Sequence, residues 1–217
     1  SGYTKDEIIA LSKILTKYKN LYILSDDIYE HITYDGFKFF TIAQIEKLKD
    51  RVLTMNGVSK AYSMTGWRIG YAAGPKDIVK AIAKIQSQST TNPSSISQAA
   101  AVEALSGTQD FINERANSFQ ERRDFVVNSL NAIDGIECLN PDGAFYVFPD
   151  VSEFFGKTIE GFKIENSSDF AMFLLEKAHV ATVTGEAFGC PDNIRISYAA
   201  SKENIIEAVK RIKRALS

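Results

Sequence analysis

The sequence predicts an α/β protein, because short apolar runs typical of buried strands alternate with segments of helical periodicity. Three such runs lie in the first third of the chain, at residues 21–25, 52–55 and 68–73. One helical segment precedes them and another follows. Ligands of α/β proteins gather at the carboxyl ends of parallel strands, so we expect the residues after the first two runs to form a site.

The chain opens on a turn that leads into an amphipathic helix. Thr4 or Ser1, followed in the sequence by acidic residues, fits the N-cap position. The apolar stripe of this helix comprises Ile8, Ile9, Leu11, Ile14 and Leu15. Because the chain does not begin with methionine, we expect it to be cut from a longer protein.

Three more helices are predicted in the middle of the chain. Gly74-Pro75 ends the third strand, and residues 76–89 have helical periodicity. Asn92-Pro93 marks a break, after which we expect a helix at about 96–105 and a long one at 110–133. The long helix is predicted to bridge two domains, which gives the divisions 1–110, 111–134 and 135–217.

The sequence pattern in the last third of the chain predicts an α+β domain. Strands are expected within residues 135–151, 181–183 and 194–198, and helices at 168–179 and 202–216.

Composition and charge exclude several classes of partner. With 45% hydrophobic residues and a net charge of −2, the chain has apolar material for a core and no basic surface for nucleic acid or anionic membrane. No apolar run approaches the about 20 residues of a membrane span, and no secretion signal is present, so we expect a cytoplasmic protein. Cys138 and Cys190 are interpreted as reduced structural thiols, and His31 and His179 are too few to predict a metal site.

One lysine, Lys60, has neighbours that favour a reactive amine. Lys60 is followed by Ala61, Met64 and Trp67, and then by Arg68. A lysine amine attacks an aldehyde only without its extra proton, a form that an apolar setting or a nearby cation favours. Arginine binds phosphate through parallel hydrogen bonds, so the pair fits pyridoxal phosphate, whose aldehyde forms a Schiff base with lysine. Taken singly, Lys60 is also compatible with a solvated surface charge and Arg68 with an ordinary ion pair.

Asp26 and Tyr29 follow the first predicted strand. A carboxylate that pairs with the pyridine nitrogen keeps it protonated, so that the ring accepts electrons, and a phenol that donates to the ring hydroxyl tunes the Schiff-base proton. The alternative is that Asp26 caps a turn and Tyr29 is half-buried packing.

A third group lies far along the chain. Arg195 lies on a predicted strand. From there, a bidentate pair of hydrogen bonds to a substrate α-carboxylate would orient an amino acid. A structural salt bridge is the alternative role for this arginine.

These motifs resemble the class I and II aminotransferases of pyridoxal-phosphate fold type I, specifically the aspartate aminotransferase branch. The resemblance covers essentially the whole chain and implies a partial large α/β domain followed by an α+β small domain. Four motifs match in the family's order: residues 25–30, 59–71, 141–146 and 193–199.

The resemblance implies a role for each matching residue. Lys60 would carry the Schiff base and act as catalytic base and acid, with Asp26 at the pyridine nitrogen and Tyr29 at the ring hydroxyl. Ser59 and Arg68 would bind the cofactor phosphate. In the substrate pocket, Arg195 would bind the α-carboxylate and Phe188 would line the wall, although Phe188 is equally compatible with plain core packing.

The chain resembles only the C-terminal half of the family. Ser1-Gly2 looks like the end of the family's Asn-Pro turn, and the phosphate-cradling loop, the ring-stacking aromatic and a tyrosine lent by the partner subunit are missing. We therefore expect the isolated chain to bind the cofactor poorly and to be inactive. Ser87 stands five positions before Asn92, where one aspartate branch has an arginine for the distal carboxylate, so that branch is disfavoured.

The resemblance implies that the full-length protein is a homodimer that moves an amino group between an amino acid, of the aspartate or aromatic type, and a 2-oxo acid such as 2-oxoglutarate. Two alternatives stay open. One is another fold type I enzyme, such as a β-eliminating lyase that uses the same lysine, aspartate and arginine. The other is a non-catalytic folding or dimerisation fragment.

Overall fold

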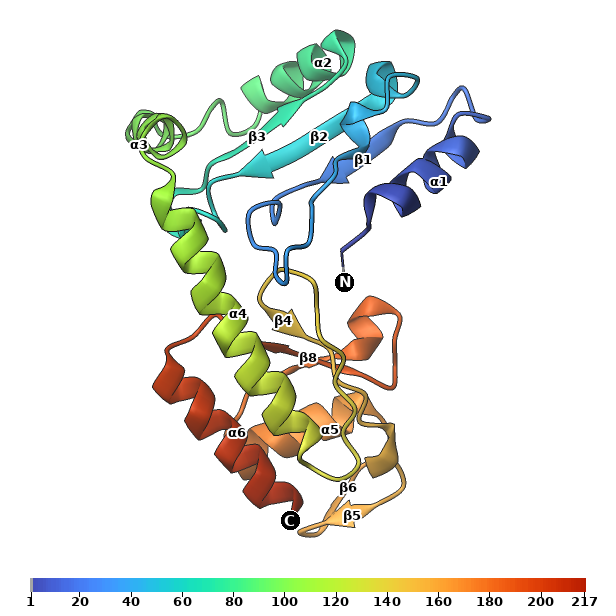
Figure 1. The fold of residues 1–217 in the computed structure, drawn as a ribbon, viewed down its shortest axis with the longest axis vertical. Coiled ribbons are helices and arrows are strands. Elements are labelled where there is room, and N and C mark those ends of the chain that lie inside the picture. The colour runs from blue at the N-terminus through green and yellow to red at the C-terminus, as the bar shows by residue number, and fades with distance from the viewer. Residues whose placement is uncertain (1) are drawn as a thin grey trace. The chain divides into compact units, whose positions relative to one another are not determined.

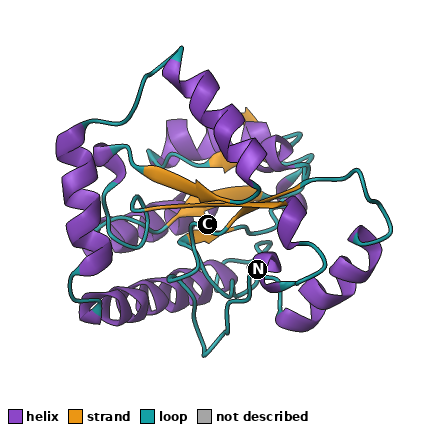
Figure 2. Ribbon diagram, turned by 90° about the horizontal axis from the view of Figure 1, so that it is seen from above, coloured by secondary structure: helices purple, strands orange, loops and turns teal. Residues whose placement is uncertain are grey.

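The computed structural model describes residues 2–217, and the part of the N-cap and turn predictions that concerns Ser1 lies outside them. The chain divides into two compact units, Gly2–Ala116 and Asn117–Ser217, and each is described by itself. Helices, strands and connecting loops are all present, as an α/β protein requires (Figure 2). None of the helices among the described residues is long and apolar enough to cross a membrane.

The first unit contains a three-stranded sheet of β1 (Ile23–Asp26), β2 (Val52–Gly57) and β3 (Gly70–Ala73), in that order (Figure 1). β1 and β2 are parallel, with Asp26 opposite Met55, and β3 runs antiparallel to β2. The carboxyl ends of β1 and β2 therefore lie at the same edge of the sheet. This edge leads into the segments that carry Asp26 and Lys60, as the strand pattern predicts.

The two outer strands are less buried than predicted. Leu24 on β1 is 62% exposed, and every residue of β3 is exposed, whereas β2 is buried at Val52 and Gly57. The prediction that the first strand is buried was wrong for this chain, because β1 is an edge strand and, within this three-stranded sheet, only β2 has a neighbour on both sides.

Three helices of this unit match their predicted positions: α1 (Lys5–Leu15), α2 (Lys76–Ser87) and α3 (Ser95–Ser106). Thr4 caps α1 in a capping box, because its side chain accepts from Glu7 N while the Glu7 carboxylate accepts from Thr4 N at 2.7 Å. Short 3₁₀ helices lie at Ile42–Gln44, Lys49–Arg51 and Thr65–Trp67. Two apolar clusters form the core, one around Ile42, Leu48 and Val52 and one around Val58, Ile69 and Ala101.

The long predicted helix is α4 (Asp110–Asn131), and the division between the two units falls within it. The second unit has an antiparallel sheet of β4 (Tyr146–Val147), β8 (Ile194–Ser197) and β7 (Val183–Thr184), with β8 in the centre. Helices α5 (Ser167–Phe173) and α6 (Lys202–Leu216) complete the α+β pattern, and Phe170, Phe173 and Leu174 are fully buried.

Three details of this unit differ from the sequence prediction. Only two residues of the expected strand region 135–151 are in β4, because Pro141 and Pro149 have no N–H to pair and Ala144 has a left-handed backbone with φ 61°. A small hairpin of β5 (Thr158–Ile159) and β6 (Phe162–Lys163) was not predicted. The helix after α5 widens into a π-helix, Leu174–Ala178, and ends at His179 in a left-handed conformation.

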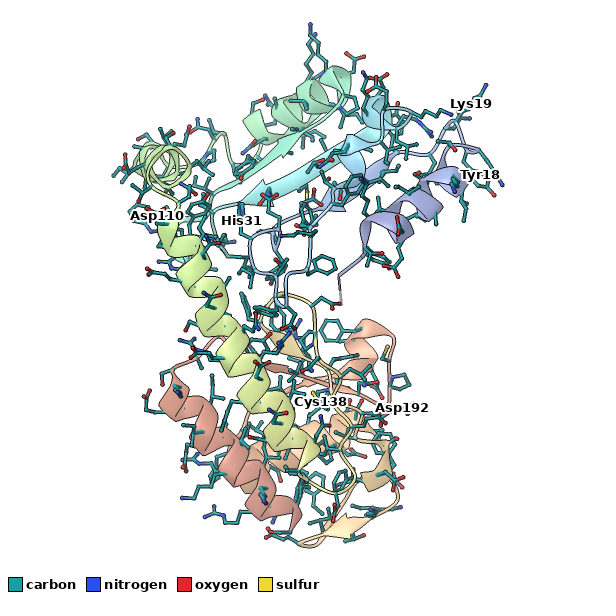
Figure 3. All side chains as sticks on the ribbon, viewed as in Figure 1. Tyr18, Lys19, His31, Asp110, Cys138 and Asp192 are labelled. Atoms are coloured by element: carbon teal, nitrogen blue, oxygen red, sulfur yellow. The ribbon has the colours of Figure 1, made fainter. Side chains whose placement is uncertain are left out.

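The two cysteines differ in their exposure. Cys138 is buried and Cys190 is exposed. Cys138, labelled in Figure 3, follows α4 in the chain. Its backbone N–H donates to Asn131 Oδ1 at 2.8 Å, and its carbonyl oxygen accepts from Asn131 Nδ2 at 2.9 Å.

Candidate active site

Two neighbouring carboxylates at the end of β1 have different environments. Asp27 is only 8% exposed, accepts a hydrogen bond from Ser25 Oγ at 2.6 Å, and donates its backbone N–H to Met55 O at 2.9 Å. Asp26 has an exposed side chain, with a long 3.4 Å contact from Ile28 N to its Oδ1 atom. Asp27 thus fastens β1 to β2, while the Asp26 carboxylate remains accessible at the sheet edge.

Lys60 follows β2 and lies beside Tyr29, which follows β1. Its side chain is half-buried, and Nζ is 5.7 Å from the centre of the Tyr29 ring. The parallel pairing of β1 and β2 explains this meeting, since both segments leave the sheet at the same edge. The fold therefore brings together two candidate residues that are 31 positions apart in the sequence.

The segment from Ser59 to Arg68 is a tight loop. Ser63 and Arg68 both have left-handed backbones, with φ 54° and 55°. Arg68 ends the 3₁₀ turn Thr65–Trp67, and its Nη1 atom donates to Thr65 O at 2.9 Å, while the side chain as a whole is exposed. Strained backbone of this kind is commonest at functional sites.

A close backbone approach fixes the start of this loop. A Cβ atom on Gly57 would lie 2.9 Å from Ile69 O, so β3 comes as near to β2 as only glycine allows. The apolar setting expected for Lys60 is partly present: Ala61 is buried, Met64 is half-buried, and Trp67 is 43% exposed.

Contacts with the start of α4, which the sequence analysis missed, hold the residues after Lys60. Arg115 Nη1 donates to Ala61 O at 3.1 Å, and Tyr62 Oη donates to Gln109 Oε1 at 2.8 Å. The Tyr62 ring also meets the Phe111 ring edge-on at 5.9 Å. No local pattern in the sequence indicates these pairs, because about fifty residues separate their members.

Glu30 is a second residue that the sequence analysis passed over. It accepts a hydrogen bond from Asn56 Nδ2 at 2.6 Å, so it joins the end of β2 to the segment after β1. Burial raises the pKa of Tyr62 and of Tyr71, and the Glu30 carboxylate adds to both increases. Glu30 thus links the end of β2 to the segment after β1 and acts electrostatically on two nearby phenols.

In the second unit, Arg195 lies on the central strand β8 and contacts two aromatic rings. Its guanidinium carbon is 4.6 Å from the centre of the Tyr146 ring and 4.6 Å from the centre of the Phe188 ring. Among the described residues, this guanidinium has ring contacts and no carboxylate partner, so the alternative of a structural salt bridge is not realised within residues 2–217.

The predicted site residues thus form two groups, one in each unit. Asp26, Tyr29, Ser59, Lys60 and Arg68 belong to the first unit, and Arg195 and Phe188 to the second. Within the described chain, no cluster of histidine, cysteine, aspartate or glutamate has the arrangement of a metal site.

Comparison with known proteins identifies the class. Residues 1–212 match the family model of aminotransferase class I and II, and the chain belongs to that family. An aspartate aminotransferase of Rhizobium meliloti strain 1021 is 55% identical over 214 residues, 98% of this chain and 52% of that protein. A probable aspartate/prephenate aminotransferase of Rickettsia prowazekii is also 55% identical, over 99% of this chain and 54% of that protein.

Solved structures agree with the sequence comparison. The crystal structure of the aspartate aminotransferase from Rhizobium meliloti has a TM-score of 0.95 and 54% identity, over 99% of this chain and 54% of that chain. The Thermus thermophilus aspartate aminotransferase with maleate has a TM-score of 0.87 and 38% identity, over 99% of this chain and 53% of that chain. The predicted family and fold class are confirmed, and the chain spans about half the length of the relatives it matches.

The family implies pyridoxal phosphate, and the residues of the first unit fit it. The accessible carboxylate of Asp26 and the amine of Lys60 beside the Tyr29 phenol form the donor set that a pyridine nitrogen, an aldehyde and a ring hydroxyl require. The exposed Arg68 guanidinium and the Ser59 hydroxyl suit a phosphate group.

Proposed function

We propose that the protein containing this chain is a pyridoxal-phosphate-dependent aminotransferase of the aspartate type. It would transfer an amino group between an amino acid and a 2-oxo acid, with 2-oxoglutarate as a substrate. The observation that carries the proposal is the position of Lys60, held beside Tyr29 at the sheet edge where β1 presents Asp26. The names of the relatives make aspartate and prephenate the first substrates to test.

When bound, pyridoxal phosphate supplies an aldehyde that condenses with amines and a ring that accepts electrons. The Lys60 amine would hold the aldehyde end of the cofactor. Asp26 would keep a proton on the ring nitrogen, Tyr29 would donate to the ring hydroxyl, and Ser59 and Arg68 would hold the phosphate.

Lys60 would have a second role, as both general base and general acid. Its Nζ atom would take the proton from the substrate Cα and later give up a proton. Arg195 orients the substrate by binding its α-carboxylate, and Phe188 lines the pocket.

The wider organisation is part of the same proposal. Residues 1–110 belong to the cofactor-binding large domain, 111–134 form an interdomain helix, and 135–217 form the small domain. The full-length protein is a cytoplasmic homodimer, and the isolated chain is inactive because half of the site lies outside it.

The test compares the full-length enzyme with variants at these positions. Lys60→Ala abolishes turnover, and Asp26→Ala leaves a yellow but nearly inert protein. Borohydride reduction followed by peptide mapping finds the cofactor on Lys60, and Lys49→Ala, which changes an exposed lysine paired with Glu46, is the control that keeps full activity. Wild-type turnover in Lys60→Ala, or no label on Lys60, disproves the proposal.

Product analysis separates the remaining alternatives. An amino group found on glutamate after incubation with 2-oxoglutarate identifies a transferase, whereas release of ammonia identifies a lyase. A full-length protein that neither binds the cofactor nor turns over any amino acid would have a non-catalytic role.

A further inference from the structure

We propose that Tyr146 and Phe188 are positioning residues that hold the Arg195 guanidinium flat between their rings, so that its edge faces the substrate carboxylate. The inference rests on the proposed function and adds Tyr146 to the site. It starts from the two 4.6 Å ring contacts of Arg195.

The geometry suits carboxylate binding because a guanidinium has two separate kinds of surface. Its flat faces attract aromatic rings, whereas its N–H donors all point outward in the plane. Ring contacts of this kind steady the group without using a single donor. The described residues place no carboxylate on that edge, which leaves the in-plane donors for a ligand.

The sheet explains how Tyr146 reaches Arg195. Tyr146 on β4 pairs with Ser197 on β8, and Arg195 is two residues away on the same strand. Residues two apart on a strand share a face, so Tyr146 and Arg195 are diagonal neighbours, a separation that an aromatic and a long side chain can bridge. The centre of the Phe145 ring lies 4.8 Å from the centre of the Tyr146 ring, so the two rings pack together.

A tight turn places the second ring. Phe188 ends the 3₁₀ helix Gly185–Phe188, and Gly185 N donates to Asn193 O at 2.7 Å, next to β8. The Phe148 ring meets Phe188 edge-on at 5.8 Å. Both rings are thus held by backbone and neighbouring rings, and each contacts Arg195.

The energetic consequence is pre-organisation. A free arginine side chain samples many rotamers and loses that freedom when it grips a carboxylate. Rings that already hold the guanidinium in place remove part of this cost, so carboxylates bind more tightly. Because the proposed contacts are to the ring faces, the aromatic character of residues 146 and 188 matters and the Tyr146 hydroxyl does not.

The experiment measures binding of maleate, a dicarboxylate without a reacting amino group, to the cofactor-loaded full-length enzyme by calorimetry. Tyr146→Leu and Phe188→Leu are each expected to weaken binding roughly 2- to 30-fold, as the loss of a cation–π contact predicts. They raise KM for the amino acid more than they lower kcat. Tyr146→Phe keeps the ring and stays within about twofold of wild type.

Phe40→Leu is the matched control, since it removes a ring that lies 5.5 Å from the Lys5 amine in the other unit. It is expected to leave maleate affinity unchanged. Circular dichroism checks that each leucine variant is folded. If one is not, the methionine variant of the same position, Tyr146→Met or Phe188→Met, is measured in its place, because methionine also lacks a ring.

The outcomes separate this inference from the proposed function. If Lys60 is labelled normally and Tyr146→Leu and Phe188→Leu both bind maleate as tightly as wild type, the positioning role is overturned while the proposed function stands. A Tyr146→Phe variant that loses as much affinity as Tyr146→Leu also overturns it, because the hydroxyl would then be responsible. Absence of label on Lys60 in the wild-type enzyme overturns the function on which the inference rests.

Discussion

Arg115 donates a hydrogen bond from Nη1 to the carbonyl oxygen of Ala61 at 3.1 Å, and so ties α4 to the residue next to Lys60. The same guanidinium lies 4.6 Å from the centre of the Phe111 ring, which in turn touches Tyr62. A long helix thus holds the backbone on the C-terminal side of the candidate catalytic lysine. This matters because proton transfer depends on the position of the amine to within a fraction of an ångström.

Arg115→Met in the full-length enzyme is expected to lower kcat about tenfold or more, with a smaller change in KM. Methionine keeps much of the side-chain volume but cannot donate to Ala61 O, so the Lys60 loop gains freedom. Steady-state kinetics give the two parameters, and hydrogen exchange at residues 61–63 reports the loop. Arg122→Met changes another arginine of α4 and serves as the control; equal kinetics for the two variants would contradict the role assigned to Arg115.

Cys138 gives the chain a pH-dependent stability at high pH. Burial raises the pKa of this thiol from 9.0 to about 11. Between these values the unfolded chain binds fewer protons than the folded one, so the free energy of unfolding falls as pH rises from about 9 to about 11. The loss from this group is about 2–3 kcal/mol once the pH exceeds both values.

Urea unfolding of wild type and Cys138→Ala at several pH values isolates this contribution from other groups. The wild type is expected to lose more stability than the variant between pH 9 and 11. Thiol labelling gives an independent check, because the exposed Cys190 reacts at pH 8 while the buried Cys138 does not. If the free energy of unfolding fell equally with pH in wild type and Cys138→Ala, Cys138 would not contribute the expected pH dependence.

Arg123 is a buried, structural arginine. It is 2% exposed, its Nη1 atom donates to Pro141 O at 3.0 Å, and its Nη2 atom lies 2.7 Å from the Asp124 carboxylate. Arg123→Ala is expected to destabilise the chain by about 2 kcal/mol, because the Pro141 carbonyl loses its donor while Asp124, at 48% exposed, can be solvated.

Equilibrium unfolding in urea measures this change. Arg211→Ala is the matched control, since Arg211 forms a surface pair with Glu207 one turn away on α6. Exposed pairs of this kind contribute roughly 0.3–0.5 kcal/mol, so the control should lie close to wild type. A loss below 1 kcal/mol for Arg123→Ala would mean that its buried contacts add little.

The sequence predicts the parts of this fold that depend on local signals. Caps, apolar periodicity and proline breaks locate α1 to α4 and α6, and the two strand ends place Asp26 and Lys60 at one edge of the sheet. What it misses depends on distant contacts. Arg115 lies outside the four matching motifs, and although Glu30 and Tyr146 lie within two of them, their contacts could not be predicted because the partner of each lies on another element. The exposure of β1 was also beyond prediction, since it depends on how many strands flank it.

Gly185 provides the last prediction, because it sets the turn that carries Phe188. A Cβ atom at this position would fall well inside van der Waals contact with the backbone carbonyl oxygens of Cys190 and Asn193. Backbone atoms cannot rotate away, so Gly185→Ala must open the turn, at an expected cost of about 2–3 kcal/mol.

Opening this turn moves Phe188 away from Arg195, so Gly185→Ala in the full-length enzyme should also weaken maleate binding. Gly161→Ala is the control. Gly161 has φ +76°, and a Cβ atom there would have nothing within 4 Å. The substitution therefore adds backbone strain of about 1–2 kcal/mol but leaves the Gly185 turn intact. Urea unfolding and calorimetry together separate the two effects. Both variants should lose stability, but only Gly185→Ala should lose affinity. Unchanged affinity in that variant would show that Arg195 holds its position without the Phe188 turn.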